Sequence, residues 1–249
     1  MSSPPPRSPF TIRRLRRAEL PHDTIALARF LIGKVVVHDL PCGRLSGRIV
    51  EAEAYPPGDP AGHHFRGPTP RIRSMYLHPG HAYVYFNYGA HFMLNVASEP
   101  AGTAGGILIR ALEPLDGVEW MQRHRGTSKL LDLTRGPGRV AAALRIDRRH
   151  DGRDLCGARG ELWLGELVPE AIAAEPASKA GTRGAAKKTA TPDKAKIPTA
   201  RVARAVRIGI SQAADRLLRF YEPGNPFVSG PKRLLLPAKP RSLAGRKSI

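Results

Sequence analysis

Short stretches of β-branched, aromatic and alternating apolar residues predict a series of strands along the chain. The side chains of a strand point to opposite faces in turn, so an apolar residue at every second position indicates a strand with one buried face. Two of these stretches flank residues 87–89 and predict a β-hairpin over residues 81–97. The predicted strands cover residues 34–39, 45–55, 82–86, 92–96, 107–112 and 203–210.

Helical spacing of apolar residues predicts a few helices between the strands. In the first of them, Leu27, Phe30 and Leu31 are expected to face the core. Pro137 suits the first turn of a helix, where free N–H groups can hold a phosphate. Helices are predicted over residues 18–31, 117–123 and 137–144. Because the strands follow one another instead of alternating regularly with helices, we predict an α+β fold: a single domain with a mostly antiparallel curved sheet, flanking helices and a protruding β-hairpin.

The chain is interpreted as one domain, 1–249, that carries three polar segments without a predicted fold. Residues 1–17 predict a flexible, basic and Pro-rich tail, and residues 236–249 predict a second basic tail. A stretch at about 175–199 is rich in Ala, Lys, Gly and Thr, which predicts a disordered basic insert that could tether DNA non-specifically. Before the last tail, a loop is predicted that contains Phe220, Tyr221, Pro226 and Phe227.

The charge of the chain narrows the expected partners. Lys and Arg number 40 against 21 Asp and Glu, which gives a formal net charge of +19. Such an excess attracts polyanions, of which nucleic acid is the commonest inside a cell. No apolar run has the length of a membrane span, and the N-terminus has no apolar segment typical of a secretory signal. Cys42 and Cys156 lie far apart without metal-ligand spacing, which predicts two inert thiols in a reducing compartment.

The predicted strand at 45–55 carries two carboxylates at alternating positions. Alternation places Val50, Ala52 and Ala54 on one face. The opposite face then carries Ile49, Glu51, Glu53 and Tyr55. Taken alone, this pattern favours a solvent-exposed face with two charges. A long loop follows at 55–70, and such loops are often functional, so a cleft lined by the carboxylates is the second interpretation.

Histidines and tyrosines near this strand could bind either a metal or a nucleic acid. Asp59, His63, His64 and Arg66 lie in the loop, but they lack the helical or finger spacing of known metal sites. The predicted hairpin places Tyr83, Tyr85 and Asn87 on one face, with Tyr88 at its turn. Tyrosine rings can stack on bases while cations contact phosphates, although burial in the core is the simpler interpretation for Tyr83.

A series of short segments, taken in order, is specific enough to indicate a family. The segments are 51–55, 59–63, 69–71, 79–85, 88–89, 94–96, 109–114, 136–137, 207–210 and 219–221. Together they resemble the alkyladenine (3-methyladenine) DNA glycosylase family, and the resemblance runs from about residue 18 to residue 229. It implies an enzyme that flips a damaged purine out of duplex DNA and hydrolyses its N-glycosidic bond.

The resemblance also implies roles for individual residues. Glu53 matches the general base that activates a water to attack C1′ of the nucleotide. Arg110 matches the arginine that holds this carboxylate and the water, and the backbone carbonyl of Ile208 matches a third water ligand. Glu51 matches no catalytic position and is interpreted as support.

Further positions match residues that contact the base and the DNA. Tyr55, His63 and Tyr85 match the side chains that enclose the flipped base, although the short loop leaves open whether His63 or His64 takes that place. Asn95 matches the residue that senses the purine edge. Tyr88 matches the wedge that fills the gap in the minor groove. DNA contacts are predicted for Tyr88, Arg71 and Arg139.

These assignments predict a monofunctional glycosylase that acts on alkylated or deaminated purines in double-stranded DNA and leaves an abasic site. No lysine lies beside Glu53 to form a Schiff base, and the predicted chemistry needs no metal or organic cofactor. We expect a monomer without membrane association, in the cytoplasm with the nucleoid of a bacterium or in the nucleus of a eukaryote. Two alternatives are a metal-dependent nuclease that uses Glu51, Glu53 and the loop histidines, and a non-enzymatic DNA-binding protein.

Overall fold

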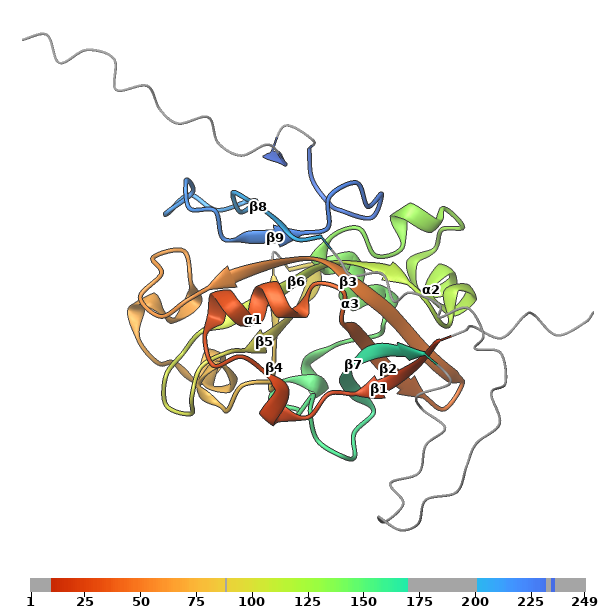
Figure 1. Cartoon of the computed structure of the whole chain (residues 1–249), viewed down its shortest axis with the longest axis horizontal. Helices are drawn as coiled ribbons and strands as arrows, with labels where there is room; N and C mark the ends of the chain where they lie inside the picture. The colour runs from red at the N-terminus through yellow and green to blue at the C-terminus, as the bar shows by residue number, and fades with distance from the viewer. Residues whose placement is uncertain (1–9, 88, 170–200, 232–233, 236–249) are drawn as a thin grey trace, which may run out of the picture.

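The computed structural model describes residues 10–87, 89–169, 201–231 and 234–235. They form one nine-stranded antiparallel sheet with short helices packed against it (Figure 1). The strands are β1 (Phe10–Arg14), β2 (Val35–Leu40), β3 (Gly43–Tyr55), β4 (Ala82–Asn87), β5 (His91–Ala97), β6 (Gly106–Pro114), β7 (Leu162–Pro169), β8 (Ala203–Ala205) and β9 (Arg219–Tyr221). The predicted α+β fold with a curved antiparallel sheet is confirmed.

The described part of the chain contains three α-helices and five short 3-10 helices. The α-helices are α1 (Thr24–Leu31), α2 (Val118–Arg125) and α3 (Pro137–Ala143). The 3-10 turns are η1 (Arg17–Glu19), η2 (His63–Arg66), η3 (Pro70–Tyr76), η4 (Leu130–Asp132) and η5 (Arg148–His150). None of the helices in the described ranges is long and apolar enough to cross a membrane.

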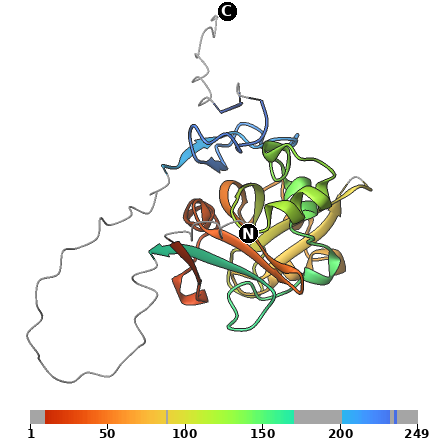
Figure 2. The ribbon, with the colours of Figure 1, turned by 90° about the vertical axis from the view of Figure 1, so that its right-hand side faces the viewer.

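Strand β3 is the centre of the sheet, because its two edges pair with three other strands. The sheet order is β1-β7-β2-β3-β6-β5-β4. One edge of β3 pairs with β6, and the other pairs first with β2 and then, from Glu51 to Glu53, with β9. Figures 1 and 2 show the segment with β8 and β9 lying on one side of the domain, against β3. Strand β9 is thereby brought to the two carboxylates of β3.

A double irregularity in the β3–β6 pairing corrects the predicted faces of β3. The register shifts between Ile49 and Glu51 and again between Glu51 and Ala52, which leaves Val50 and Arg110 without a directly opposed partner. Such bulges turn side chains to the other face. Ile49 therefore packs in the main core with Ala52, whereas Val50 packs in a second cluster. The strict alternation predicted for this strand was wrong.

Helix α1 begins later than the sequence pattern predicted. Its N-cap is Asp23, whose side chain accepts a hydrogen bond of 2.6 Å from the amide of Ala26. Asp is a preferred N-cap residue because it satisfies a free N–H group of the first turn. The preceding residues form η1 instead, so the predicted helix over 18–31 was too long by one and a half turns.

The termini of the domain also differ from the predictions. Residues 10–14, predicted as part of a flexible tail, form β1 and pair with β7 along its full length. The predicted strand at 203–210 ends at Ala205, and the predicted loop around Phe220 and Tyr221 contains β9. β7 was not predicted. The insert at 175–199 and the tail at 236–249 lie outside the described residues.

The pairing of β4 with β5 places the tyrosines of the predicted hairpin on the sheet. Tyr83 lies opposite Asn95, and Tyr85 lies opposite Met93. Residue 88, at the predicted turn, lies outside the described residues, so a protruding hairpin stays a prediction.

We predict that Gly165→Ala destabilises the domain by about 1–3 kcal/mol because it separates β1 from β7. A Cβ atom at this position would lie 2.6 Å from Cγ2 of Ile12 and 2.9 Å from the carbonyl oxygen of Arg13. Urea unfolding measures the loss. Gly160→Ala is the control, because its Cβ would meet no atom closer than 3.7 Å. Equal stability of the two variants would contradict the place of β1 in the sheet.

Candidate active site

A cavity of about 320 Å³ opens where β3, β4, β5 and β6 meet the loop after β3 and the turn after β8. Its walls combine aromatic rings, an amide and a guanidinium group. The lining residues are Tyr55, Ala61, His63, Met75, Tyr83, Tyr85, Asn87, Met93, Asn95, Gly106, Leu108, Arg110, Pro137, Ile208, Gly209 and Ile210. Of the residues expected to catalyse or bind the base, the structure brings all but Glu53 into this lining.

Glu53 lies directly behind the cavity wall, with its carboxylate held by three lining residues. The Tyr55 hydroxyl donates to Oε2 over 2.9 Å, and Nη1 of Arg110 lies 3.2 Å from the same oxygen. The backbone N–H of Ile208 donates to Oε1 over 2.7 Å. Both Glu51 and Glu53 are 0% exposed, so the interpretation of a solvent-exposed strand face was wrong.

The electrostatics of these groups follow from their burial. The pKa of the Tyr55 hydroxyl is raised, first by burial and then by the neighbouring charge of Glu53, so the hydroxyl stays a donor. Burial alone would lower the pKa of Arg110, but Glu53 and Glu51 more than offset it and the pKa is raised. Arg110 is therefore a permanent cation beside both carboxylates.

Glu51 is the second buried carboxylate and balances the charge of the arginines. Its Oε1 accepts from Nε of Arg110 over 3.2 Å and from Nη1 of Arg219 over 3.0 Å. Its Oε2 accepts from the backbone N–H of Ser229 over 2.6 Å. Since Arg219 is also fully buried, Glu51 links the cavity arginine to β9, which supports its interpretation as a supporting residue.

A second buried ion pair fixes the loop after β3. Asp59 and Arg207 are both completely buried, with Nη1 of Arg207 2.9 Å from Oδ2 of Asp59. Arg207 also donates to the carbonyl oxygen of Ala54 over 2.9 Å, and its guanidinium lies 4.6 Å from the centre of the Tyr55 ring. Arg216 adds a contact of 3.1 Å to Asp59. The pair therefore holds Tyr55, the loop and the turn with Ile208 in one arrangement.

An aromatic cluster forms one wall of the cavity. The rings of His63 and Tyr85 meet edge to face with centroids 4.5 Å apart, and Tyr85 stacks on Tyr83 at 5.3 Å. Nδ1 of His63 lies 2.9 Å from the Tyr83 hydroxyl. Tyr83 is buried, as predicted. The pKa of His63 is lowered by burial, then by Arg71 and His64, so the ring is neutral at neutral pH.

His63 and His64 point in different directions, which bears on the choice left open between them. His63 lines the cavity, whereas His64 is absent from the lining. Nε2 of His64 lies 2.9 Å from the carbonyl oxygen of Pro56, and its ring packs tightly against Gly62. The geometry therefore favours His63 as the residue that faces a ligand in the cavity.

The model of one family, described as Methylpurine-DNA glycosylase (MPG), matches residues 18–226. The chain belongs to the methylpurine-DNA glycosylase family. This match confirms the resemblance seen in the sequence. Members of this family are hydrolases of N-glycosyl bonds in DNA.

Relatives in several bacteria match most of the chain, and each is provisionally named 3-methyladenine DNA glycosylase. The protein of Mesorhizobium japonicum is 55% identical over 220 residues, which are 88% of this chain and 92% of the relative. That of Paraburkholderia phytofirmans is 44% identical and covers 89% of this chain and 91% of its own length. That of Chlorobaculum tepidum is 40% identical and covers 83% of this chain and 86% of its own length.

Arg71 and Arg139, two of the residues predicted to contact DNA, do not line the cavity of this glycosylase. Arg71 donates to the carbonyl oxygen of Phe86 on β4 over 3.1 Å. Arg139 lies on α3, two residues after the cavity-lining Pro137, and pairs with Asp132 at 2.7 Å. Tyr88 lies outside the described residues, and the preceding Asn87 lines the cavity.

Sequence reasoning missed Arg207 and Arg219 as parts of the site. Both lie in segments that were noted for their resemblance to the family, but no pattern near them indicates burial. Their partners Asp59 and Glu51 are 148 and 168 residues away in the chain. The available signal was an arginine within a short apolar segment, which calls for a buried acid as its partner.

The thiols of Cys42 and Cys156 are free, and burial raises the pKa of Cys156 to about 11.

We predict that Arg219→Met destabilises the glycosylase by about 3–5 kcal/mol, because it leaves Glu51 buried with one cation fewer. Urea unfolding gives the change in the free energy of unfolding. Arg139→Met is the control, since its ion pair is about half exposed and is worth about 1 kcal/mol or less. A loss at Arg219 no larger than at Arg139 would show that the buried network does not hold the site together.

Proposed function

We propose that this glycosylase flips alkylated or deaminated purines out of double-stranded DNA and hydrolyses the N-glycosidic bond with a water activated by Glu53. The observation that carries the proposal is the position of Glu53: a fully buried carboxylate, fixed by Tyr55, Arg110 and Ile208, behind an aromatic cavity. Membership of the family and the names of its bacterial relatives support the substrate class.

The cavity suits one base. Its volume of about 320 Å³ is at the small end of ligand pockets, which favours a single ring system over a longer segment of nucleic acid. Tyr55, His63 and Tyr85 enclose the base in our proposal. A purine alkylated at N3 or N7 carries a positive charge, and electron-rich ring faces attract such a cation by about 0.5–2 kcal/mol each. Purines alkylated at N3 or N7 are thereby favoured over neutral bases.

The hydrogen bonds of Glu53 leave a place for the water. A carboxylate offers about four acceptor sites, and Tyr55, Arg110 and Ile208 occupy three of them. In our proposal the attacking water donates to the fourth. Its proton passes to Glu53, its oxygen forms the bond to C1′, and the electrons of the broken C1′–N bond leave with the base. The product is an abasic site, and the negative carboxylate also stabilises the developing oxocarbenium ion.

Ile208 makes a contact that was not expected from the resemblance. Its backbone N–H donates to Glu53, while the expected role of its carbonyl oxygen as a ligand of the water stays a prediction. Gly209 follows in the left-handed region at φ +76°, where glycine is favoured. This turn presents the Ile208 peptide to the cavity, so we propose that its N–H orients the carboxylate while its carbonyl oxygen is available to the water.

Asn95 is proposed to sense the purine edge. Its Nδ2 donates to the carbonyl oxygens of Tyr83 and Met93 over 3.1 and 3.4 Å. The amide is therefore fixed while its Oδ1 accepts no hydrogen bond from the described residues. In this place the side chain crowds the exocyclic amine of guanine, which would exclude that normal base.

We propose that Tyr88 enters the minor groove while Arg71 and Arg139 contact phosphates. The net charge of +19 supports an electrostatic attraction to duplex DNA. A base inside the duplex is out of reach of the cavity, so it must first be turned out of the stack. The gap that it leaves is then filled by a wedge residue. Asn87, the residue before Tyr88 in the chain, lines the cavity. We further propose a monomer that acts in the bacterial cytoplasm, at the nucleoid.

The arrangement of the carboxylates does not favour the alternative of a metal-dependent nuclease. Arginine side chains contact both Glu51 and Glu53, and a neighbouring cation opposes the binding of another. Within the described ranges, the one group of three side chains with metal-binding spacing does not include a cavity residue.

We predict that Glu53→Gln lowers the single-turnover release of 3-methyladenine from alkylated duplex by at least about a hundredfold, because the amide cannot accept the water's proton. Binding to the duplex should stay within about twofold of wild type. The control Glu119→Gln, an exposed residue on α2, should keep full activity, and EDTA should leave the rate of base release by the wild type unchanged. Unchanged turnover in Glu53→Gln would exclude the proposed base.

We predict that Tyr88→Ala weakens binding to abasic-site DNA by about tenfold or more, with a smaller loss on undamaged duplex, since only a flipped state leaves a gap to fill. Fluorescence anisotropy with the two duplexes measures both affinities. Tyr88→Phe keeps the ring and should restore binding to the abasic site. Equal losses on both duplexes would speak against a wedge.

A further inference from the structure

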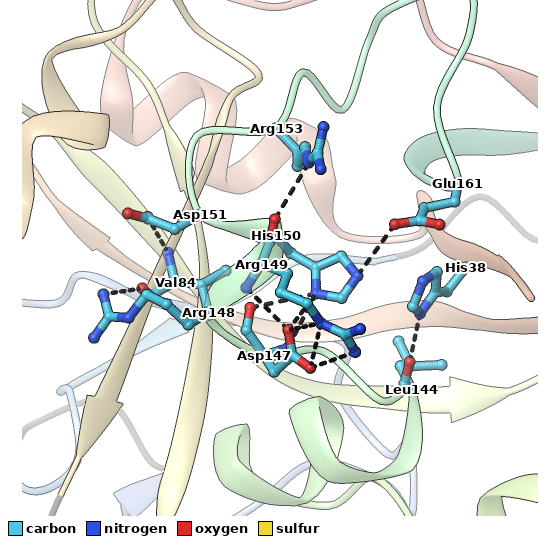
Figure 3. A network of polar contacts seen from close by, with 10 residues as sticks. All are labelled: His38, Val84, Leu144, Asp147, Arg148, Arg149, His150, Asp151, Arg153 and Glu161. Carbon is cyan, nitrogen blue, oxygen red and sulfur yellow. Dashed lines mark hydrogen bonds and ion pairs between the residues drawn. The ribbon is translucent and has the colours of Figure 1, made fainter.

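Two histidines and a glutamate form a cluster far from the catalytic cavity. His38 lies on β2, His150 ends η5, and Glu161 precedes β7 (Figure 3). His38 pairs with Leu45 on β3, which precedes Glu53 by eight residues, or roughly 26 Å of extended strand. The cluster is therefore separate from the cavity, and nothing in the proposed reaction uses it.

His38 has a buried nitrogen without a partner. Its Nδ1 lies 2.6 Å from the carbonyl oxygen of Leu144. A carbonyl only accepts, so Nδ1 carries the proton and Nε2 presents a lone pair. The side chain is 1% exposed, and Nε2 has no hydrogen-bond partner among the described residues. An unsatisfied buried acceptor costs stability, which calls for a ligand.

His150 and Glu161 face the same space as His38. The rings of the two histidines meet edge to face with centroids 4.8 Å apart, and Nε2 of His150 lies 3.7 Å from Oε1 of Glu161. On its other side, Nδ1 of His150 accepts from the backbone N–H of Asp147 over 3.1 Å, and Oδ1 and the carbonyl oxygen of Asp147 each lie 3.3 Å from the same nitrogen. An oxygen beside Nδ1 is the usual arrangement that orients an imidazole for metal binding through Nε2. His38 has this arrangement, and His150 adopts it when its ring proton is on Nδ1 and points to an oxygen of Asp147.

The spacing suits a small divalent cation. One ligand atom from each of the three side chains lies within 4.8 Å of the others. Three atoms with this spacing have a point within about 2.8 Å of all of them, so movements below about 1 Å give the Zn–N distance of about 2.0–2.1 Å. Glu161 can make this movement, because its side chain is 58% exposed. Its backbone is held beside β2 by the N–H of Asp39 at 2.8 Å.

We propose that His38, His150 and Glu161 bind one Zn²⁺ ion as a structural site, with water as the fourth ligand. Two imidazoles and a carboxylate form a ligand set that zinc accepts. When Nε2 of His150 binds the metal, the ring proton is on Nδ1. There it donates a hydrogen bond to the carboxylate of Asp147. The ion fastens β2, η5 and the start of β7 to one another.

The same turn supports the aromatic wall of the cavity. Nη1 of Arg148 donates to the carbonyl oxygen of Val84 over 3.0 Å, and Oδ1 of Asp151 accepts from the Val84 amide over 2.9 Å (Figure 3). Val84 lies between Tyr83 and Tyr85 on β4. Zinc at His150 would therefore stabilise the turn that clamps the strand carrying these tyrosines.

The test uses the full-length protein stripped of metal and titrated with ZnCl₂ in competition with a chromophoric chelator. We predict one saturable site, and a rise in Tm of about 5–10 °C at a zinc concentration about a hundredfold above Kd. Co²⁺ should give the visible absorption of a tetrahedral site. Glu161→Gln should weaken zinc binding by about tenfold or more, whereas the exposed control Glu119→Gln should bind like the wild type.

The variant at Glu161 keeps the proposal falsifiable, because an exposed side chain can change without unfolding the domain. Its Tm without metal should equal that of the metal-free wild type. The proposal is overturned if no saturable site is found, or if Glu161→Gln and Glu119→Gln bind zinc equally. The second outcome would assign the metal to other histidines of the chain.

Discussion

The neutralisation of two buried glutamates by two buried arginines is the interaction on which this structure depends. Glu51 and Glu53 are fully excluded from solvent, and such charges are tolerated inside a protein only when paired and hydrogen-bonded. Arg110 contacts both carboxylates, and Arg219 completes the balance at Glu51. Because Tyr55, Arg110 and the backbone of Ile208 all contact it, the carboxylate of Glu53 is held in one orientation before any ligand binds.

The pairing of β3 with β6 and β9 brings these four side chains together. The irregular pairing of β3 with β6 leaves Arg110 without an opposed residue and lets it contact both glutamates. The short strand β9 pairs with the other edge of β3 and delivers Arg219. A separate buried pair, Asp59 with Arg207, ties the loop after β3 to the turn after β8. Distant parts of the chain thus meet around the two neighbouring carboxylates of Glu51 and Glu53.

The sequence predicted most of the strands, the fold class and the family, because alternation and ordered motifs are local signals. It did not predict that Glu51 and Glu53 are buried, since the arginines responsible are remote: Arg110 and Arg219 lie 59 and 168 residues from Glu51. Nor did alternation reveal the bulge at Val50, which depends on pairing with β6. β1 was missed because its five residues satisfy their hydrogen bonds only through β7, near the other end of the domain.

In our proposal, the damaged base occupies the aromatic cavity and the C1′ atom of its nucleotide faces Glu53. The most direct measurement is a crystal structure of Glu53→Gln bound to a duplex that contains hypoxanthine. We predict an intact nucleotide turned out of the helix, its base between Tyr55, His63 and Tyr85, and a water between residue 53 and C1′. A lesion that stays stacked in the duplex, or a base bound elsewhere on the protein, would contradict the account.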